Sequence, residues 1–268
     1  MERIPFKFGG TLIFEGRDKI GTVQIAETKS RIRSLHFDSR AKQSAADMNE
    51  PFRLNLEYSR AMMMSLLFVK RLERVLSLGL GGGSIPKFLY RYFADCTVDV
   101  VESRKLVIDL AYRFFELPRD KRVRVFHQNA EDFLGECQKN RYDLIFVDLF
   151  GKSGISSAVA DRRFAESLQS AVDSSGVVVL NLWTRPKLTY RNIRNDLLIR
   201  FDKRVLDLPI AERINCVLFA LNAADTKFDD KQMEKKARLF EKAFGIDFPL
   251  FARELIKCNR ALVGKSVG

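Results

Sequence analysis

A glycine-rich segment constrains the fold more than any other feature of this chain. Residues 79–83 read Gly-Leu-Gly-Gly-Gly and follow a short apolar run, residues 75–78, that is typical of a buried β-strand. A helix is expected from Ser84. Glycine permits a sharp turn and a close approach of the backbone to a ligand, and the first turn of a helix presents free N–H groups. The segment therefore predicts a βα turn that either binds a ligand or only reverses the chain.

The order of strands and helices around this turn predicts the fold class. Expected strands alternate with expected helices, as they do in βαβ units, and these strands span residues 75–78, 98–101, 123–126, 144–147 and 176–180. Such alternation predicts a parallel sheet that helices cover on both faces. Residues 1–50 instead contain short β-rich runs separated by turns. We therefore expect an α/β protein with a small antiparallel β domain in residues 1–50 and a doubly wound, mostly parallel sheet in residues 51–268.

Polar side chains follow three of these strands. Glu102 ends the second strand, about 20 residues beyond Gly79, where a carboxylate reaches both hydroxyls of a ribose. Asn129 follows the third strand and suits either an adenine amino group or the N-cap of the next helix. Asp148 follows the fourth strand, where a carboxylate acts as a base, holds a cationic amine or caps the next loop. Together with the glycine segment, these residues favour a nucleoside site at the carboxyl edge of the sheet.

Composition narrows the chemistry further. The four cysteines are widely spaced and there are only two histidines, so neither a metal site nor a disulfide framework is expected. We see no signal peptide and no membrane span, and we expect a cytoplasmic protein with no membrane partner. The formal net charge of +12 suggests an anionic partner. Seven basic residues between 185 and 204 read more readily as a solvated helix face than as a phosphate-binding patch, so nucleic acid is considered but not favoured.

The chain from residue 75 to residue 183 resembles the spermidine synthase (aminopropyltransferase) family. The segments that carry the resemblance are VLSLGLGGGSIP, VDVVES, NAEDFL, YDLIFVDLFG and GVVVLNLW. A weaker match lies upstream, at His36-Phe37-Asp38 with Gln43-Ser44 and at Tyr58. The resemblance implies a methyltransferase-type, Rossmann-like sheet preceded by a small β domain. It also implies polyamine biosynthesis, in which decarboxylated S-adenosylmethionine donates an aminopropyl group to a small-molecule amine, and a homodimer.

The resemblance also assigns roles to individual positions. It implies a catalytic carboxylate at Asp148 and acceptor contact at Tyr58. The positions implied to surround the nucleoside are Gln43, Gly79, Gly81, Gly83, Ser84, Glu102, Asn129 and Ala130. No metal is implied. In this chemistry the protein mainly positions the reactants and excludes water, because the sulfonium of the donor supplies the driving force.

The chain departs from the family where the family carries acids. Ser84 replaces an acid directly after the glycines, Gly151 replaces a second aspartate, Arg60 replaces a glutamate, and Asn129 stands where aspartate is common. A polyamine carries two or more positive charges, and desolvating them requires paired carboxylates. An acid at position 84 suits the ammonium of the decarboxylated donor, whereas a serine at a helix N-terminus tolerates the carboxylate of ordinary S-adenosylmethionine.

Four functions therefore remain open from the sequence. The first is an aminopropyltransferase with an altered acceptor site, which the resemblance favours. The second is an S-adenosylmethionine-dependent methyltransferase that uses the same pocket. The third is a nucleoside-binding relative with little catalysis. The fourth is a nucleic-acid-modifying enzyme, although the Asp-Leu-Phe-Gly sequence after the fourth strand differs from the motif of base-amino methyltransferases.

Overall fold

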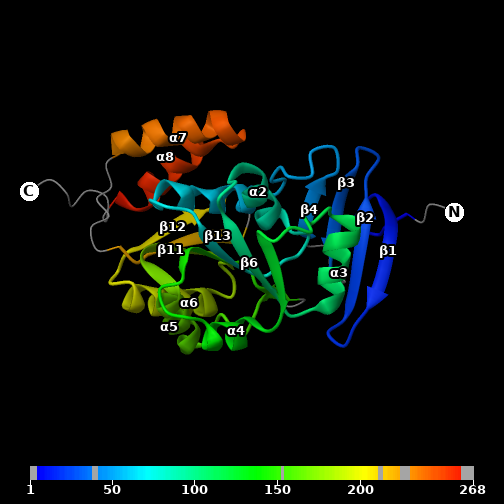
Figure 1. The fold of residues 1–268 in the computed structure, drawn as a ribbon, viewed down its shortest axis with the longest axis horizontal. Coiled ribbons are helices and arrows are strands. Elements are labelled where there is room, and N and C mark those ends of the chain that lie inside the picture. The colour runs from blue at the N-terminus through cyan, green and yellow to red at the C-terminus, as the bar shows by residue number, and fades with distance from the viewer. Residues whose placement is uncertain (1–4, 38–41, 152–153, 211–213, 224–229, 261–268) are drawn as a thin grey trace, which may run out of the picture.

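The described part of the protein consists of a seven-stranded sheet, a four-stranded sheet, the two-stranded β9–β10 hairpin and a set of covering helices (Figure 1). The computed structural model describes residues 5–37, 42–151, 154–210, 214–223 and 230–260. In chain order the elements are β1 (Thr11–Arg17), β2 (Thr22–Glu27), β3 (Ile32–His36), β4 (Lys42–Asp47), α1 (Glu57–Met62), the 3₁₀ helix η1 (Met63–Leu67), β5 (Arg74–Leu78), α2 (Ser84–Tyr92), β6 (Thr97–Glu102), α3 (Lys105–Phe114), β7 (Val123–His127), α4 (Ala130–Glu136), β8 (Tyr142–Val147), β9 (Phe150–Gly151), β10 (Gly154–Ile155), α5 (Arg162–Ala171), β11 (Val172–Trp183), α6 (Lys187–Arg200), β12 (Val205–Pro209), β13 (Asn215–Leu221), α7 (Asp230–Phe244) and α8 (Phe248–Cys258).

The larger sheet has seven strands in the order β12-β13-β11-β8-β5-β6-β7. Strands β11, β8, β5, β6 and β7 are parallel, and β13 runs antiparallel to both of its neighbours. After β5 the chain adds β6 and then β7 on one side of β5, and it then adds β8 on the other side of β5. This reversal opens a crevice at the carboxyl ends of β5 and β8, where open α/β sheets bind ligands. The predicted doubly wound, mostly parallel fold is confirmed.

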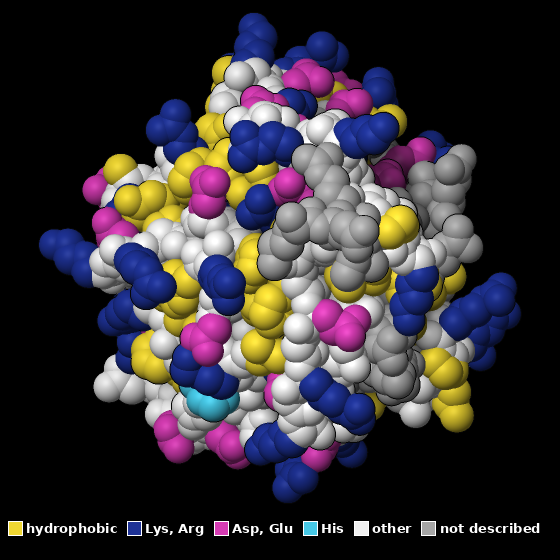
Figure 2. All heavy atoms as spheres, turned by 90° about the vertical axis from the view of Figure 1, so that its right-hand side faces the viewer, with side chains coloured by type: hydrophobic (Ala, Val, Ile, Leu, Met, Phe, Trp, Pro, Cys, Tyr) yellow, Lys and Arg dark blue, Asp and Glu magenta, His cyan; other side chains and the backbone are white. Residues whose placement is uncertain are grey.

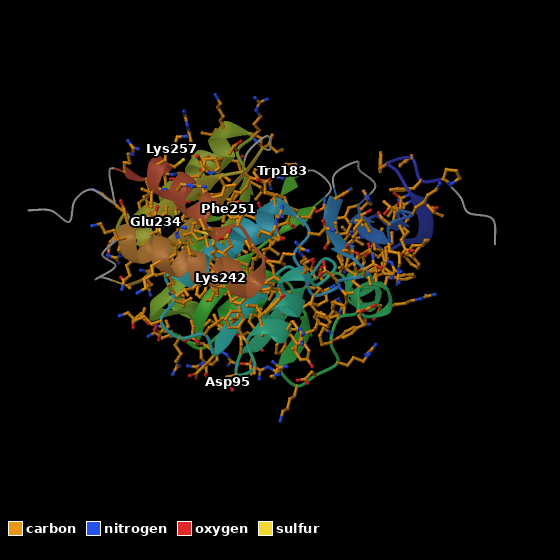
Figure 3. The ribbon with its side chains drawn as sticks, turned by 90° about the horizontal axis from the view of Figure 1, so that it is seen from above. Asp95, Trp183, Glu234, Lys242, Phe251 and Lys257 are labelled. Carbon is orange, nitrogen blue, oxygen red and sulfur yellow. The ribbon has the colours of Figure 1, made fainter. Side chains whose placement is uncertain are left out.

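Helices cover both faces of this sheet, which explains the continuous apolar runs in its strands. In β8, Leu144 and Phe146 pack into the cluster formed with η1, α2, α7 and α8, whereas Ile145 and Val147 pack into the cluster formed with α4, α5 and α6. Figure 3 shows the outer pair of helices from above, with Glu234 and Lys242 on α7 and Phe251 on α8. Among the helices in the described ranges, none is long and apolar enough to cross a bilayer.

The smaller sheet is antiparallel, in the order β1-β2-β3-β4, and it packs against α3 (Figure 1). Val23, Ile25 and Leu35 of this sheet form a buried cluster with Val107 and Leu110 of α3. The sheet lies within residues 1–50, for which a small β domain is expected, and the boundary at residue 50 stays a prediction. This packing holds β4 beside the glycine turn of the larger sheet, where Ser44 neighbours Gly81 and Gly82.

Three elements differ from the sequence-based expectation. Strand β4 was not predicted, because Lys42–Asp47 has no β-branched residue and depends on its pairing with β3. The apolar spacing of residues 54–68 predicts one helix, but α1 gives way to the 3₁₀ turns of η1 at Met63. The spacing of residues 164–172 predicts a helix that ends at Val172, and a strand is predicted only from Gly176; in the structure β11 already begins at Val172 and continues to Trp183.

Candidate functional site

A cavity of about 530 Å³ lies in the crevice between the carboxyl ends of the parallel strands and the smaller sheet. It unites predicted residues from six separate parts of the chain. Those that line it are Gln43, Tyr58, Gly79, Gly81, Ser84, Glu102, Asn129, Ala130 and Asp148. Because parallel strands end at one edge, residues that are 50 or more positions apart in sequence meet here.

The glycine segment forms the floor of this cavity, and two of its glycines have left-handed backbone angles there. Gly79 has φ +95° and Gly81 has φ +53°. A Cβ at Gly79 would lie 2.4 Å from the carbonyl oxygen of Asp148, so this position admits no side chain. Gly83 was predicted to line the site, but it is not among the lining residues. It stands at the N-cap of α2 with φ +70°, and a Cβ there would meet Leu117 instead. A glycine at this position therefore allows the left-handed turn into α2 and the close packing of Leu117 behind the cavity.

The N-terminus of α2 points its free N–H groups at the cavity. Ser84 begins this helix, and no acidic residue lies in its first turn. The hydroxyl oxygens of Ser84 and Ser44 are 3.4 Å apart, which joins α2 to β4. Gln43 precedes Ser44 on β4 and enters the cavity wall. This end of the cavity therefore offers hydroxyls and helix N–H groups rather than negative charge.

Glu102 ends β6 and faces the cavity from beside the glycine turn. Its carboxylate accepts hydrogen bonds from the backbone N–H of Leu80 at 3.2 Å and of Arg104 at 2.9 Å. Burial raises the pKa of Glu102, and these backbone hydrogen bonds act in the opposite direction. An ionised carboxylate has about four acceptor positions, so these backbone groups leave capacity for a hydroxyl group of a ligand.

Asp148 follows β8 at the centre of the cavity. Tyr58 donates its hydroxyl hydrogen to Oδ2 at 3.1 Å, and Asn181 donates an amide hydrogen to Oδ1 at 2.9 Å. Burial raises the pKa of Asp148 to about 6, although both hydrogen bonds lower it. The same burial, together with the neighbouring carboxylate, raises the pKa of Tyr58. A carboxylate with this pKa is ionised near neutral pH and still able to accept a proton.

Sequence reasoning missed Asn181, which holds the Asp148 carboxylate in place. Asn215 on β13 donates an amide hydrogen to Oδ1 of Asn181 at 2.8 Å, so the amide group of Asn181 must face Asp148. Both asparagines lie beside the cavity on neighbouring antiparallel strands. A usable signal existed in the sequence, because Asn181 interrupts the apolar run of β11 just before that strand reaches the crevice.

Arg104 was also missed, and it lines the cavity between the two sheets. Its guanidinium donates to both carboxylate oxygens of Asp18, at 2.9 Å and 2.8 Å, and to the carbonyl oxygen of Gly21. The Arg104 guanidinium holds the pKa of Asp18 below its ordinary value. This ion pair, in which Arg104 is buried and Asp18 partly buried, fixes the β1–β2 turn over the end of β6. No local sequence pattern predicts it.

The structure bears on two of the positions where the chain lacks an acid that the family carries, Arg60 and Asn129. Arg60 is not among the lining residues, so its replacement of a glutamate does not bear on the cavity wall. Asn129 occupies the N-cap position of α4 without a side-chain capping bond and donates to Asp132 at 3.2 Å. It also lines the cavity, so an adenine contact stays a prediction. Asp38 lies outside the described residues.

Of the seven basic residues between 185 and 204, three pair with neighbouring acids, namely Arg194, Arg200 and Arg204. Arg194 donates to both oxygens of Asp207, and Arg200 pairs with Glu166 at 2.9 Å. Figure 2 shows a different face, the one over the smaller sheet, where Lys and Arg side chains are interspersed with Asp and Glu rather than gathered into one patch. In the described part of the chain, no group of three or more His, Cys, Asp or Glu side chains is placed to hold a metal ion.

The fold and the cavity define the class as a methyltransferase-type doubly wound α/β protein with a glycine turn and strand-end carboxylates at its switch point. Residues 56–197 match the spermine/spermidine synthase domain. The chain is 32% identical over 243 residues to the polyamine aminopropyltransferase of Chromobacterium violaceum, covering 90% of this chain and 92% of that protein. The chain therefore belongs to the spermine/spermidine synthase family.

The chain is also similar to a solved spermidine synthase structure and to a methyltransferase sequence. A spermidine synthase crystallised with the transition-state analogue AdoDATO has a TM-score of 0.73 at 17% identity, covering 94% of this chain and 88% of that one, and it supports the fold. The eEF1A lysine and N-terminal methyltransferase of Xenopus laevis is 28% identical over 180 residues, which are 63% of this chain but 25% of that protein. Methyltransferases thus share part of the sequence pattern.

Proposed function

We propose that the protein transfers an aminopropyl group from decarboxylated S-adenosylmethionine to a small-molecule amine. The observation that carries this proposal is the setting of Asp148: a carboxylate of raised pKa, held by Tyr58 and Asn181, in one cavity with the glycine turn and Glu102. The identity to polyamine aminopropyltransferases over most of the chain supports the same function.

The reaction needs few catalytic groups. Asp148 accepts one proton from the ammonium of the acceptor, which frees the nitrogen lone pair. The nitrogen then attacks the methylene carbon next to the sulfonium, a C–N bond forms, the C–S bond breaks, and its electron pair stays on the sulfur of the leaving methylthioadenosine. The new secondary amine keeps its positive charge, so one proton is released overall. Holding the two reactants in line in a water-poor cavity supplies the remaining acceleration.

The cavity residues divide between the two reactants. In this proposal Glu102 accepts hydrogen bonds from the ribose, and Gln43, Asn129 and Ala130 enclose the rest of the nucleoside. Gly79 and Gly81 leave room for the thioether, and Ser84 faces the terminal group of the donor. The hydroxyl group of Tyr58 donates a hydrogen bond to Asp148 at 3.1 Å and so positions the carboxylate. Tyr58 also contacts the acceptor in this proposal.

Methyl transfer from ordinary S-adenosylmethionine is a second candidate, and one observation favours it. The cavity wall at the start of α2 includes Ser84 and Ser44, and no acid lies in the first turn of the helix. Helix N–H groups there suit the carboxylate of S-adenosylmethionine. The methyltransferase that is 28% identical supports the same alternative.

Isothermal titration with both donors, followed by product analysis, tests these two functions. We expect decarboxylated S-adenosylmethionine to bind and to release methylthioadenosine when an amine is added. Ser84→Asp should shift the ratio of the two affinities toward the decarboxylated donor by about 3- to 30-fold, because a carboxylate there attracts the ammonium of the decarboxylated donor and repels the carboxylate of the other. Formation of S-adenosylhomocysteine instead identifies a methyltransferase. If neither donor binds, both proposals are wrong.

The pH dependence should reveal the role of Asn181. Transfer should fall as pH decreases through about 6, since Asp148 must be ionised to accept a proton. Asn181→Leu removes a hydrogen bond that lowers the pKa of Asp148, so the acidic limb of the kcat/KM profile should move up by about one pH unit. Asn222→Ala is the matched control, because Asn222 donates to Asp173 at the other end of the sheet. An unmoved limb in Asn181→Leu would show that this residue does not tune the base.

Three further expectations follow the family. The protein is expected to act as a homodimer in the cytoplasm on a small-molecule amine. Nucleic acid is not favoured as a partner, because Arg194 and Arg200 of the basic cluster already pair with acids.

A further inference from the structure

We propose that the acceptor is an amine with a single positive charge and a neutral tail, rather than a diamine or polyamine. This inference rests on the proposed aminopropyl transfer and specifies its acceptor. It derives from the chemistry of the cavity wall beyond Asp148, where the acceptor must lie for its nitrogen to reach that carboxylate.

The wall beyond Asp148 is uncharged in the described part of the chain. It comes from the β9–β10 hairpin, the turn that follows it and the first turn of α6. The residues are Phe150, Gly151, Ile155, Ser156, Ser157, Ala160 and Thr189. They offer apolar surface and hydroxyl groups.

The other acids that line the cavity lie on its nucleoside side. Glu102 ends β6, and Glu131 lies in the first turn of α4, directly after β7. In the sheet, β6 and β7 stand on one side of β5, whereas β8 and Asp148 stand on the other. The glycine turn after β5 therefore separates these two carboxylates from the acceptor side of the cavity. Among the described residues that line the acceptor side, Asp148 is the one acid.

One carboxylate balances one ammonium. A second ammonium on the acceptor side would lose hydration at a cost of several kcal/mol, and no carboxylate other than Asp148 lies on that side among the described residues. A neutral tail instead gains about 0.8 kcal/mol for each methylene group that it buries. The cavity therefore favours a monoamine over a diamine of the same length.

The apolar part of this wall is held in place by packing. The rings of Phe150 and Trp183 lie 5.3 Å apart, and a Cβ at Gly154 would approach the Trp183 ring to 3.2 Å. Phe150 and Gly154 therefore pack directly against Trp183, which lies at the carboxyl end of β11. This contact keeps Phe150 and Ile155 in the wall of the cavity, where they contact a neutral tail.

A comparison of matched acceptors tests the inference. Release of methylthioadenosine from decarboxylated S-adenosylmethionine is measured with butylamine, 4-amino-1-butanol and 1,4-diaminobutane, which differ only at the far end. We expect kcat/KM for at least one of the two monoamines to exceed that for the diamine by about tenfold or more.

A carboxylate added to the wall should reverse this preference. Gly151 lines the cavity, and its Cβ position is open, so Gly151→Asp fits without strain. It should raise kcat/KM for the diamine relative to butylamine by about tenfold. Gly135→Asp is the matched control, because Gly135 is exposed on α4, outside the lining residues, and is equally open; it should leave the ratio unchanged.

The outcomes separate this inference from the function on which it rests. A preference of the unmodified protein for 1,4-diaminobutane overturns the acceptor inference and leaves aminopropyl transfer intact. Release of methylthioadenosine with none of the amines overturns aminopropyl transfer itself, and the acceptor inference with it. A monoamine preference that Gly151→Asp reverses and Gly135→Asp does not supports both.

Discussion

Asp148→Asn is expected to lower kcat by about 10³-fold while the affinity for the nucleoside donor stays within about twofold. A positioned general base contributes about 10²- to 10⁴-fold, and an asparagine cannot accept the proton of an ammonium. Asparagine keeps the shape of the side chain: its oxygen still accepts from Asn181, and its amide donates to the hydroxyl oxygen of Tyr58. Donor affinity by titration and the single-turnover rate of methylthioadenosine release measure the two effects separately.

The same substitution should not weaken the fold. Burial raises the pKa of Asp148 from 3.8 to about 6 in the folded protein. The folded state therefore favours the protonated form, and stability is lost as pH rises from about 4 through 6, by at most about 3 kcal/mol. A neutral asparagine removes this cost, so the midpoint of thermal unfolding at pH 8 should stay equal or increase. A slow variant with a raised unfolding temperature identifies a chemical defect. Full turnover in Asp148→Asn would show that another group accepts the proton.

Gly79→Ala is expected to abolish donor binding and to destabilise the fold by about 2–4 kcal/mol. The added Cβ would lie 2.4 Å from the carbonyl oxygen of Asp148, which is backbone and cannot turn aside, and φ +95° is strained for alanine. Relief of this clash must separate the ends of β5 and β8. Thermal unfolding and titration with the decarboxylated donor measure the two effects.

A second glycine provides the control for that substitution. Gly135 lies in the described helix α4 with open space at its Cβ position, so Gly135→Ala should stabilise the protein by about 0.5–1 kcal/mol and leave donor binding unchanged. If Gly79→Ala behaves like Gly135→Ala, the close approach of the glycine turn to Asp148 is not essential to the site.

Much of the site was predictable because it depends on short-range patterns. Gly79 and Gly81 follow a buried strand and precede a helix, and Glu102 and Asp148 each follow a strand of the same kind. In a parallel sheet such ends meet at one edge, so a local pattern also predicts which distant residues come together. Gly83 shows the limit of this reasoning: it belongs to the same glycine run, yet it turns behind the cavity toward Leu117.

The sequence by itself determined the doubly wound fold, the glycine turn and the strand-end carboxylates, since each follows from a periodicity or a turn within a few residues. The tertiary structure alone decided what surrounds Asp148. Tyr58 reaches it across 90 positions and Asn181 across 33, and Asn215 orients Asn181 from an antiparallel strand. Such contacts depend on the packing of whole elements against one another, and no pattern within a single element encodes them. Burial raises the pKa of the proposed base, and the hydrogen bonds from Asn181 and Tyr58 oppose this effect.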